Sequence, residues 1–227
     1  MRCAVVLLLA LLAGGAAAAP PPDTLAQRVQ ACTACHGKEG RAAADGYHPR
    51  IAGKPALYLY HQLVNFREGR RRYGPMVYLV DHLNDDYLRE IAGHFAALDL
   101  PYPAPAPVIE SVATLQQGER LALHGDAARR LPACRACHGE ALTGVAPAIP
   151  GLLGLPRDYL KGQIGAWTNG LRRAHAPDCM ADIARRLTPE DVSAVAAWLA
   201  SRPVPVPSKA AESLPEPLPL ECGSVPR

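Results

Sequence analysis

Two short motifs in the chain gather residue types that can hold a metal cofactor. Cys32–Gly37 reads Cys-Thr-Ala-Cys-His-Gly, and Cys134–Gly139 reads Cys-Arg-Ala-Cys-His-Gly. Cys-x-x-Cys-His is the signature of covalent haem attachment: two thiols add to the haem vinyl groups and the following histidine ligates the iron. The short spacing lets one turn of chain present all three groups to one porphyrin face. The sequence therefore predicts two covalent haems, bound through Cys32, Cys35 and His36 and through Cys134, Cys137 and His138.

A single Cys-x-x-Cys pair would leave two other kinds of site open, a thioredoxin-type redox pair and half of a zinc site. A thioredoxin-type pair belongs near a β-α-β pattern, which this chain lacks. A zinc site joins its two cysteine pairs across roughly 15 to 20 residues, whereas these pairs lie far apart in the sequence. A histidine after both pairs favours haem over either alternative.

The sixth ligand of each iron is predicted from the methionines, because the chain contains only Met1, Met76 and Met180. Met76 and Met180 follow their motif histidines at nearly equal distances along the sequence, each in a proline-, glycine- or charge-rich loop before the last helix of its half. A lone methionine is ordinarily core filler. The matched positions favour iron ligation instead. Six other histidines could also coordinate iron, but none repeats at an equivalent position in the other half. Only His82 and His175 flank the methionine loops. The six are His48, His61, His82, His94, His124 and His175.

The elements that must position these ligands are also repeated, and the same landmarks return in the same order. The matched pairs are Pro49–Gly53 with Pro147–Gly151, Tyr58 with Tyr159, Leu59 with Leu160, Gln62 with Gln163, Phe66 with Trp167, and Gly69 with Gly170. Met76 and Met180 each lie seven residues before a leucine. The pattern indicates that one domain has been duplicated.

Each repeat has helical patterns and no convincing strand alternation. Helices are expected over 23–31 and 114–124, ahead of the cysteine motifs, and each motif should close or follow its helix. Second helices should have Pro55 and Pro156 in their first turns and end near Gly69 and Gly170. Last helices should begin after the N-cap signals at 84–86 and 188–191, where apolar residues recur every three or four positions. We predict an all-α fold of two tandem domains, each with three to five helices around a haem.

The remaining segments set the domain boundaries. Arg2, an apolar run and small residues predict a signal peptide over 1–19; the run is too short to span a membrane, and an uncleaved N-terminal anchor is the alternative. The N-terminal domain is expected over 20–99 and the C-terminal domain over 113–202. Alternating prolines predict an extended linker over 100–112, and a second proline-rich stretch predicts a tail over 203–227.

The amino-acid composition is consistent with two cores that each hold a cofactor, and it does not indicate a nucleic-acid-binding protein. Only 5% of the 227 residues are aromatic, so a bulky cofactor would supply apolar volume to each domain. With 24 basic and 21 acidic residues spread over both halves, a nucleic-acid binder with a strongly basic face is not indicated.

Haem attachment does not use Cys179 or Cys222, and we predict a disulfide between them in an oxidising compartment.

Tandem Cys-x-x-Cys-His-Gly domains with Pro-x-Ile-x-Gly, Tyr-Leu-x-x-Gln and Met seven residues before Leu resemble the dihaem cytochrome c4 family over nearly all of the mature chain. The resemblance implies two class I cytochrome c folds related by pseudo-twofold symmetry. It implies His/Met ligation at both irons, through His36 and Met76 and through His138 and Met180. It also implies that the carbonyls of Pro49 and Pro147 accept the ligand histidines' N–H groups.

The predicted function is electron transfer, because two strong axial ligands leave no open coordination position for a substrate. We expect an electron carrier and not an enzyme. The resemblance implies a periplasmic location and redox partners of the respiratory chain, with a cytochrome bc1-type complex as donor and a terminal oxidase as acceptor; association with the membrane surface is left open. The nearer alternative is the electron-accepting subunit of a flavin- or quinone-dependent dehydrogenase, of the sulfide-oxidising flavocytochrome type. A dihaem peroxidase would need one iron without methionine.

One departure from the family pattern is the basic run Arg70–Arg72 before Met76, which is matched by Arg172 and Arg173 before Met180. Such runs are often only a solvated face. Their place near the methionine segments also fits a docking patch for an acidic partner.

Overall fold

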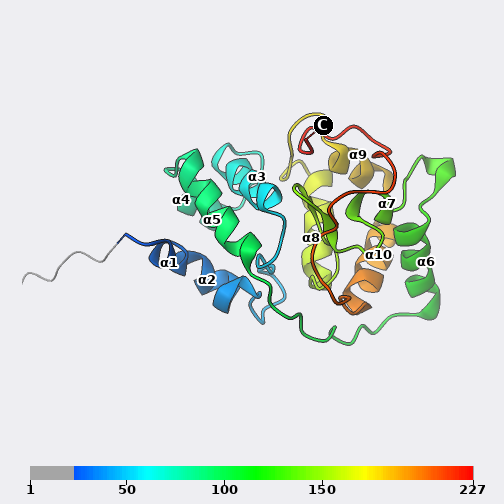
Figure 1. Cartoon of the computed structure of the whole chain (residues 1–227). Helices are drawn as coiled ribbons and strands as arrows, with labels where there is room; N and C mark the ends of the chain where they lie inside the picture. Colours follow the sequence, from blue (N-terminus) through cyan, green and yellow to red (C-terminus); the bar gives the residue numbers. More distant parts are fainter. Residues whose placement is uncertain (1–22, 227) are drawn as a thin grey trace, which may run out of the picture.

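The computed structural model describes residues 23–226, and its chain is helical apart from one two-stranded sheet (Figure 1). The predicted signal peptide lies outside the described residues. The first half contains α1 (Leu25–Arg28), α2 (Gln30–His36), α3 (Ala56–Arg67), α4 (Gly74–Val80) and α5 (Asp85–Ala97). The second half contains α6 (Val112–Leu123), α7 (Arg135–His138), the strands β1 (Gly144–Val145) and β2 (Ile149–Pro150), and then α8 (Arg157–Thr168), α9 (Cys179–Arg186) and α10 (Pro189–Ser201).

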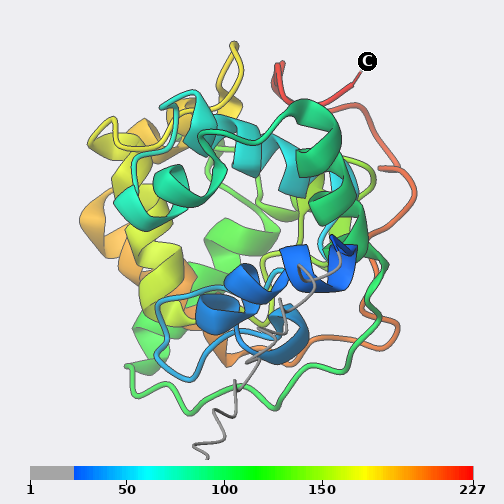
Figure 2. The same cartoon turned by 90° about the vertical axis from the view of Figure 1, so that its left-hand side faces the viewer.

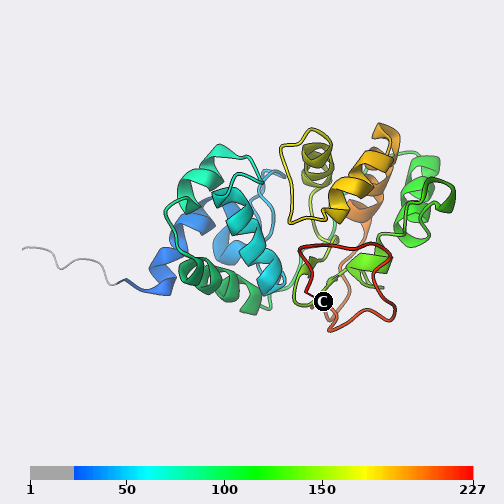
Figure 3. The same ribbon diagram turned by 90° about the horizontal axis from the view of Figure 1, so that it is seen from above.

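The two halves are separate bodies that lie against each other. Figure 3 shows them side by side. Figure 2 views the molecule from the side of the first half, with α1 and α2 in front and the second half behind. The apolar cores are also separate: Leu88, Ile91 and Phe95 are buried in the first half, and α10 buries a core of its own in the second. Each half is therefore a domain.

The duplication predicted from the sequence is visible in the order and length of the helices. Helices α3 and α8 have 12 residues each, and α5 and α10 have 13 each. A short helix, α4 or α9, stands before the last helix of each half. The two domains thus share one order of elements.

The predicted starts of the last helices are confirmed in atomic detail. The Asn84 side chain accepts a hydrogen bond from Tyr87 N at 2.9 Å. Thr188 Oγ1 accepts from Asp191 N at 3.2 Å, and the Asp191 side chain accepts from Thr188 N at 3.0 Å, which completes a capping box. These caps satisfy backbone donors at the point where each helix begins.

The first cysteine motif closes helix α2, and the second follows α6, where it forms α7, a separate four-residue helix. Each motif thus closes or follows a helix, as expected, but three other local expectations were wrong. The methionines lie in α4 and α9 and not in loops. Pro55 and Pro156 are N-caps, one position before the first helical turn. The pair β1–β2 was not expected, because a two-residue strand is too short to produce an alternating pattern.

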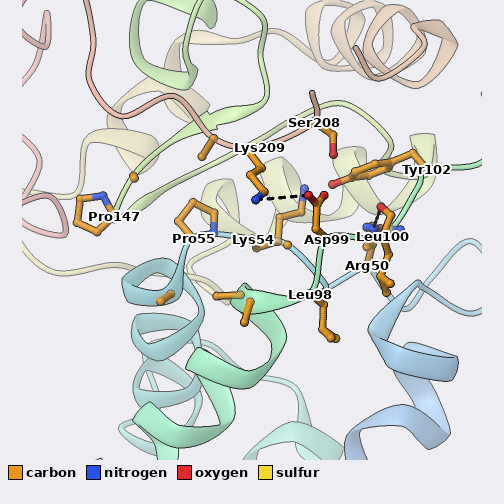
Figure 4. Close-up of a pocket in the computed structure, with 16 residues that line it drawn as sticks. Arg50, Lys54, Pro55, Leu98, Asp99, Leu100, Tyr102, Pro147, Ser208 and Lys209 are labelled. Carbon is orange, nitrogen blue, oxygen red and sulfur yellow. Dashed lines mark hydrogen bonds and ion pairs between the residues drawn. The ribbon is translucent and has the colours of Figure 1, made fainter. Parts of the chain in front are cut away.

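Both proline-rich segments are held by specific contacts. The segment 98–111 has no helix or strand, and Arg50, which is 3% exposed, donates to Leu100 O at 2.6 Å and to Pro101 O at 3.3 Å. Its guanidinium also lies over the Tyr102 ring, 3.9 Å from the centroid. In the tail, Lys209 pairs with Asp99 at 3.4 Å (Figure 4). Segment 98–111 and the tail therefore meet beside a cavity of about 380 Å³ at the junction of the two domains.

The tail after α10 lies along the second domain and does not extend into solvent as a free chain. Ala211 N donates to Gly144 O at 2.9 Å, and Ala146 N donates to Ala211 O at 2.8 Å, so the tail pairs beside β1. Among the described residues, no helix is both long and apolar enough to cross a membrane.

A buried carboxylate stabilises the second domain. Asp191, 3% exposed, accepts hydrogen bonds from Gln117 at 2.8 Å and from the half-buried Arg129 at 2.5 Å. Burial alone would raise the pKa of Asp191, but the hydrogen bonds from Arg129, the Thr188 backbone and Gln117 outweigh it and hold the pKa below its ordinary value.

Asp191→Asn is expected to lower the free energy of unfolding by about 2 kcal/mol, because it removes the charge from a buried acceptor of charge-assisted hydrogen bonds. The pKa of Asp191 is lower in the folded state, so this stabilisation is present above the pKa of the unfolded chain, about 4, and is lost as the pH falls through the folded value. Denaturant unfolding of the holoprotein at neutral and acid pH measures both effects. Asp86→Asn, whose side chain is 93% exposed, is the control and should change little. Equal stability of the Asp191 variant and wild type at neutral pH would contradict this prediction.

Candidate functional site

The two cysteine motifs end in the same backbone turn. Gly37 and Gly139 follow the motif histidines with φ of 75° and 84°, in the region that favours glycine. A Cβ atom on Gly37 would lie 2.2 Å from Ala42 O, so no larger residue fits without a shift of the backbone. The glycine therefore lets the chain turn away directly after the histidine.

Both motif histidines are buried and oriented by a backbone carbonyl. His36 Nδ1 lies 2.8 Å from Pro49 O, and His138 Nδ1 lies 2.7 Å from Pro150 O. Each residue is 8% exposed, and burial lowers the pKa of both imidazoles, which favours the neutral form that binds metal. When Nδ1–H donates to the carbonyl, the Nε2 lone pair is left to act as an iron ligand.

The acceptor for His138 differs from the one implied by the resemblance, which was Pro147. The loop between the motif histidine and the Pro-x-Ile-x-Gly segment is shorter in the second repeat, so Pro147 comes too soon after His138. Pro150 lies at nearly the same sequence distance from His138 as Pro49 does from His36. Pro147 lies in the turn between β1 and β2, where its carbonyl accepts from the first domain's backbone N–H groups at positions 57 and 58, at 3.1 and 3.3 Å.

None of the four motif cysteines forms a disulfide, and their exposure to solvent differs. Cys35 is exposed, while Cys32, Cys134 and Cys137 are partly buried. Burial raises the pKa of Cys32 and Cys137, and raises that of Cys134 to about 11. Conversion of the motif thiols to thioethers would remove these acidic protons. The exposure of Cys35 makes the first motif the more accessible of the two.

The methionines are both partly buried, on the short helices that precede the last helix of each domain. Met76 packs against a cluster that includes Val64, Phe66 and Leu88. Met180 follows Cys179 at the start of α9. The structure therefore repeats the order motif, long helix, methionine helix and last helix in both domains.

The other histidines occupy different environments. His82 is 93% exposed. His48 pairs with Asp45 at 2.6 Å, and its ring lies 6.1 Å from that of His36. His61 and His175 come from different domains, and their ring centroids are 5.1 Å apart. No pair of these histidines repeats the matched placement of Met76 and Met180.

A disulfide joins Cys179 to Cys222, the two cysteines outside the motifs. It fastens the tail to the first residue of α9, beside Met180. Gly223 N also donates to Pro177 O at 2.9 Å, so the backbone supports the same attachment. The bond closes a sequence separation of 43 residues, for which chain entropy alone gives about 4 kcal/mol.

Cys222→Ser is expected to destabilise the second domain by up to about 4 kcal/mol, because the unfolded chain regains the freedom that the bond removes. Denaturant unfolding measures this loss, and Ser213→Ala in the same tail is the control. Thiol counting on denatured, unreduced wild-type holoprotein should detect neither Cys179 nor Cys222. Two reactive thiols, or unchanged stability in the variant, would contradict the bond.

The donor set of each domain fits a c-type haem. Two thiols outside any disulfide and a histidine lie on one turn, and a carbonyl orients the imidazole. Each domain also has one methionine on a later helix, and a thioether is a soft donor of the kind that suits iron in an electron carrier. Sequence reasoning missed Pro150 as the acceptor for His138, and its only signal was its distance along the sequence from His138.

Known proteins support this interpretation. The chain is 37% identical over 183 residues to a thiosulfate dehydrogenase electron acceptor from Thiomonas intermedia, covering 81% of this chain and 83% of that one. It is 31% identical over 174 residues to a cytochrome c4 from Pseudomonas aeruginosa, covering 76% of this chain and 84% of that one. No protein-family model matches the sequence.

A similar solved structure is that of the thiosulfate dehydrogenase TsdBA from Marichromatium purpuratum. It superposes with a TM-score of 0.67 and 34% sequence identity over 76% of this chain. The match covers 36% of that protein, so the chain corresponds to about a third of its length.

Proposed function

Because the chain belongs to the dihaem cytochrome c4 family, together with thiosulfate dehydrogenase electron acceptors, we propose that it accepts electrons from a thiosulfate dehydrogenase and passes them to a further redox protein. Members of this family carry two covalent c-type haems, and this chain is a dihaem electron-transfer cytochrome. The observation that carries the choice of donor is the 37% identity to an electron acceptor named for that dehydrogenase.

The proposed haem ligands follow the repeated donor sets. Cys32 and Cys35 attach the first haem, with His36 and Met76 as axial ligands. In the second domain the attachment residues are Cys134 and Cys137, and the axial ligands are His138 and Met180. Pro49 and Pro150 support the histidines through their carbonyls.

The haem supplies the one-electron chemistry, and the protein's part is to hold each iron in a closed environment. The carbonyls of Pro49 and Pro150 keep the imidazoles in one tautomer and one orientation, which raises their basicity as ligands. When haem is bound, the histidine and methionine of each domain would hold its iron, and the site would transfer electrons without needing a proton-transfer group from the protein.

The periplasm is the proposed location. The expected signal peptide over 1–19 would export the chain, and the Cys179–Cys222 disulfide suits an oxidising compartment. Donor and acceptor proteins would meet the cytochrome there.

A second candidate function is transfer from a bc1-type complex to a terminal oxidase. The 31% identity to a cytochrome c4 favours it. In both candidates the chain is a carrier, and the difference lies in the protein that donates the electrons.

Reduction by a thiosulfate dehydrogenase tests the proposal. The oxidised holoprotein is mixed with catalytic amounts of thiosulfate dehydrogenase and excess thiosulfate, and haem reduction is followed by absorption. We expect both haems to be reduced rapidly, with no reduction when the enzyme is omitted. If the enzyme reduces an artificial acceptor but not this cytochrome, the proposed donor is wrong, and reduction by a bc1-type complex would then favour the second candidate.

A further inference from the structure

The backbone segments that orient the motif histidines correspond in the two domains. The acceptor residues Pro49 and Pro150 follow their motif histidines by 13 and 12 residues. Two positions beyond each acceptor, a backbone N–H donates to the carbonyl four residues after the motif histidine, at 2.9 Å in the first domain and 2.8 Å in the second. The residues directly after the acceptors, Arg50 and Gly151, therefore hold equivalent places.

In the first domain, a side chain of the segment itself holds the segment in place. Arg50 is 3% exposed and donates to Ala52 O at 3.2 Å. It also donates to two carbonyls of the segment 98–111 and lies over the ring of Tyr102. Because all these partners belong to the first domain or to the chain that directly follows it, the support of Pro49 needs no residue of the second domain.

The second domain cannot place a side chain at the equivalent position. A Cβ atom on Gly151 would lie 2.5 Å from Thr143 O, so the backbone would have to shift to admit one. The buried Gly151 carbonyl instead accepts a hydrogen bond from the ammonium of Lys54 in the first domain, at 3.2 Å. Lys54 is 5% exposed and lines the cavity at the domain junction beside Arg50 and Tyr102 (Figure 4). A lysine of one domain thus supports the segment of the other.

The first domain holds the segment around Pro150 on both sides. The carbonyl of Pro147 accepts from two backbone N–H groups at the start of α3, at 3.1 and 3.3 Å. The Gly151 carbonyl, one peptide beyond Pro150, accepts from Lys54. Between these two attachments, the Pro150 carbonyl lies 2.7 Å from His138 Nδ1. Of the two, the contact with Lys54 is the nearer along the chain to the carbonyl that orients the imidazole.

We propose that Lys54 of the first domain is a positioning residue for the second haem. Through Gly151 it fixes the Pro150 carbonyl, which in turn holds the His138 imidazole in one orientation and one tautomer. A hydrogen bond from a charged donor is roughly twice as strong as one between neutral groups, so the ammonium limits the movement of the peptide that it holds. The orientation of the second histidine ligand therefore depends on the domain junction, and that of the first does not.

Other residues hold the opposite end of the domain junction. Arg71 and Arg172 form an antiparallel backbone bridge, flanked by hydrogen bonds of 2.9 and 2.7 Å that the N–H groups of Arg72 and Arg173 donate. Both bridge arginines also donate to the same two glutamines, one from each domain. Arg71 and Arg172 are therefore neither a solvated face nor a docking patch, whereas Arg72 and Arg173 have exposed side chains. The N–H groups of Arg72 and Arg173 report whether this end of the junction is closed.

The test is NMR of the ferrous holoprotein, in which exchange of the His138 Nδ1–H proton with solvent is measured. Lys54→Met keeps an unbranched side chain that suits burial and removes the donor. We expect the His138 proton to exchange about tenfold faster, because a lost charge-assisted hydrogen bond frees the carbonyl that protects it. The His36 proton should stay within about twofold of its wild-type rate. In the ferric protein, the haem methyl shifts, which depend on the plane of the axial imidazole, should change at the second site alone.

Two controls separate positioning from charge and from loosening of the junction. Lys209→Met removes a cation that lines the same cavity but pairs with Asp99, and it should leave both histidine protons unchanged. In Lys54→Met, the backbone N–H groups of Arg72 and Arg173 should exchange as in wild type. An unchanged His138 proton in Lys54→Met would overturn the proposal, and so would an equal effect of Lys209→Met. Equal acceleration at Arg72 and Arg173 would also overturn it, because Lys54 would then only hold the domains together.

The inference rests on the proposed ligation of the second haem by His138 and not on the electron donor, since the test uses no thiosulfate dehydrogenase. Failure of the two can be told apart in the wild-type spectrum. Ring protons of a haem ligand are shifted strongly upfield in the ferrous state. If the wild-type His138 ring protons lack that shift, the ligation is wrong and the proposed role of Lys54 is wrong with it.

Discussion

Replacing Met180 by histidine is expected to lower the reduction potential of the second haem by about 0.1 to 0.2 V, a part of the roughly 0.8 V range that axial ligands span. Thioether sulfur favours ferrous iron more than a second imidazole does. The haem should stay attached, because the motif cysteines are unchanged. Redox titration measures the shift, and the weak near-infrared sulfur-to-iron band of the ferric protein should lose the contribution of the second site.

The matched variant Met76→His should move the first haem by a similar amount and leave the second nearly unchanged. Met180→Ala should instead open a coordination position that carbon monoxide can occupy. Rapid binding of carbon monoxide to either haem of the ferrous wild-type protein would show that closed ligation is wrong at that site. A dihaem peroxidase, in which one iron lacks a methionine ligand, would then again be a candidate function.

Cys35→Ser is expected to impair covalent attachment at the first motif alone. Each thioether forms at its own cysteine, and the two motifs lie in separate domains. Denaturing mass spectrometry should show two haems on the wild-type mature chain from a host that attaches haem c, and a large fraction with one haem on the variant.

Cys222→Ser is the control for a lost thiol, because Cys222 lies in the disulfide and outside both motifs. It should keep two haems. A wild-type product with one haem or none would contradict the assignment of both motifs, and so would a Cys35 variant that retains two fully attached haems.

The amino-acid pattern was enough to predict the helices and the donor residues. Two thiols and a histidine within five residues must lie together whatever the fold, because little more than one helical turn spans that distance. The caps at Asn84 and Thr188 are local for the same reason, since side chain and backbone are three residues apart. The repeat then predicts Met76 and Met180 as ligands by their matched positions.

Matching landmarks between the repeats could not identify the carbonyl that orients His138. The loop after the second motif is shorter than the loop after the first, so the aligned Pro147 turns toward the first domain and Pro150 takes its place. An alignment of landmarks pairs residues by type and order. Which carbonyl points at the imidazole depends instead on the direction of the backbone in the turn.

The sequence alone determined the starts of the last helices and the duplication of the domain, because those properties depend on neighbours within a few positions or on the repeat. The haem-binding residues are likewise predicted from local motifs and from the repeat. The environment of Arg71 and Arg172 follows only from tertiary packing. Their contacts join residues about a hundred positions apart, and the same basic run is exposed at Arg72 and packed against the second domain at Arg71. Whether a charge faces water or a second domain depends on how the two repeats pack, and no local pattern encodes that packing.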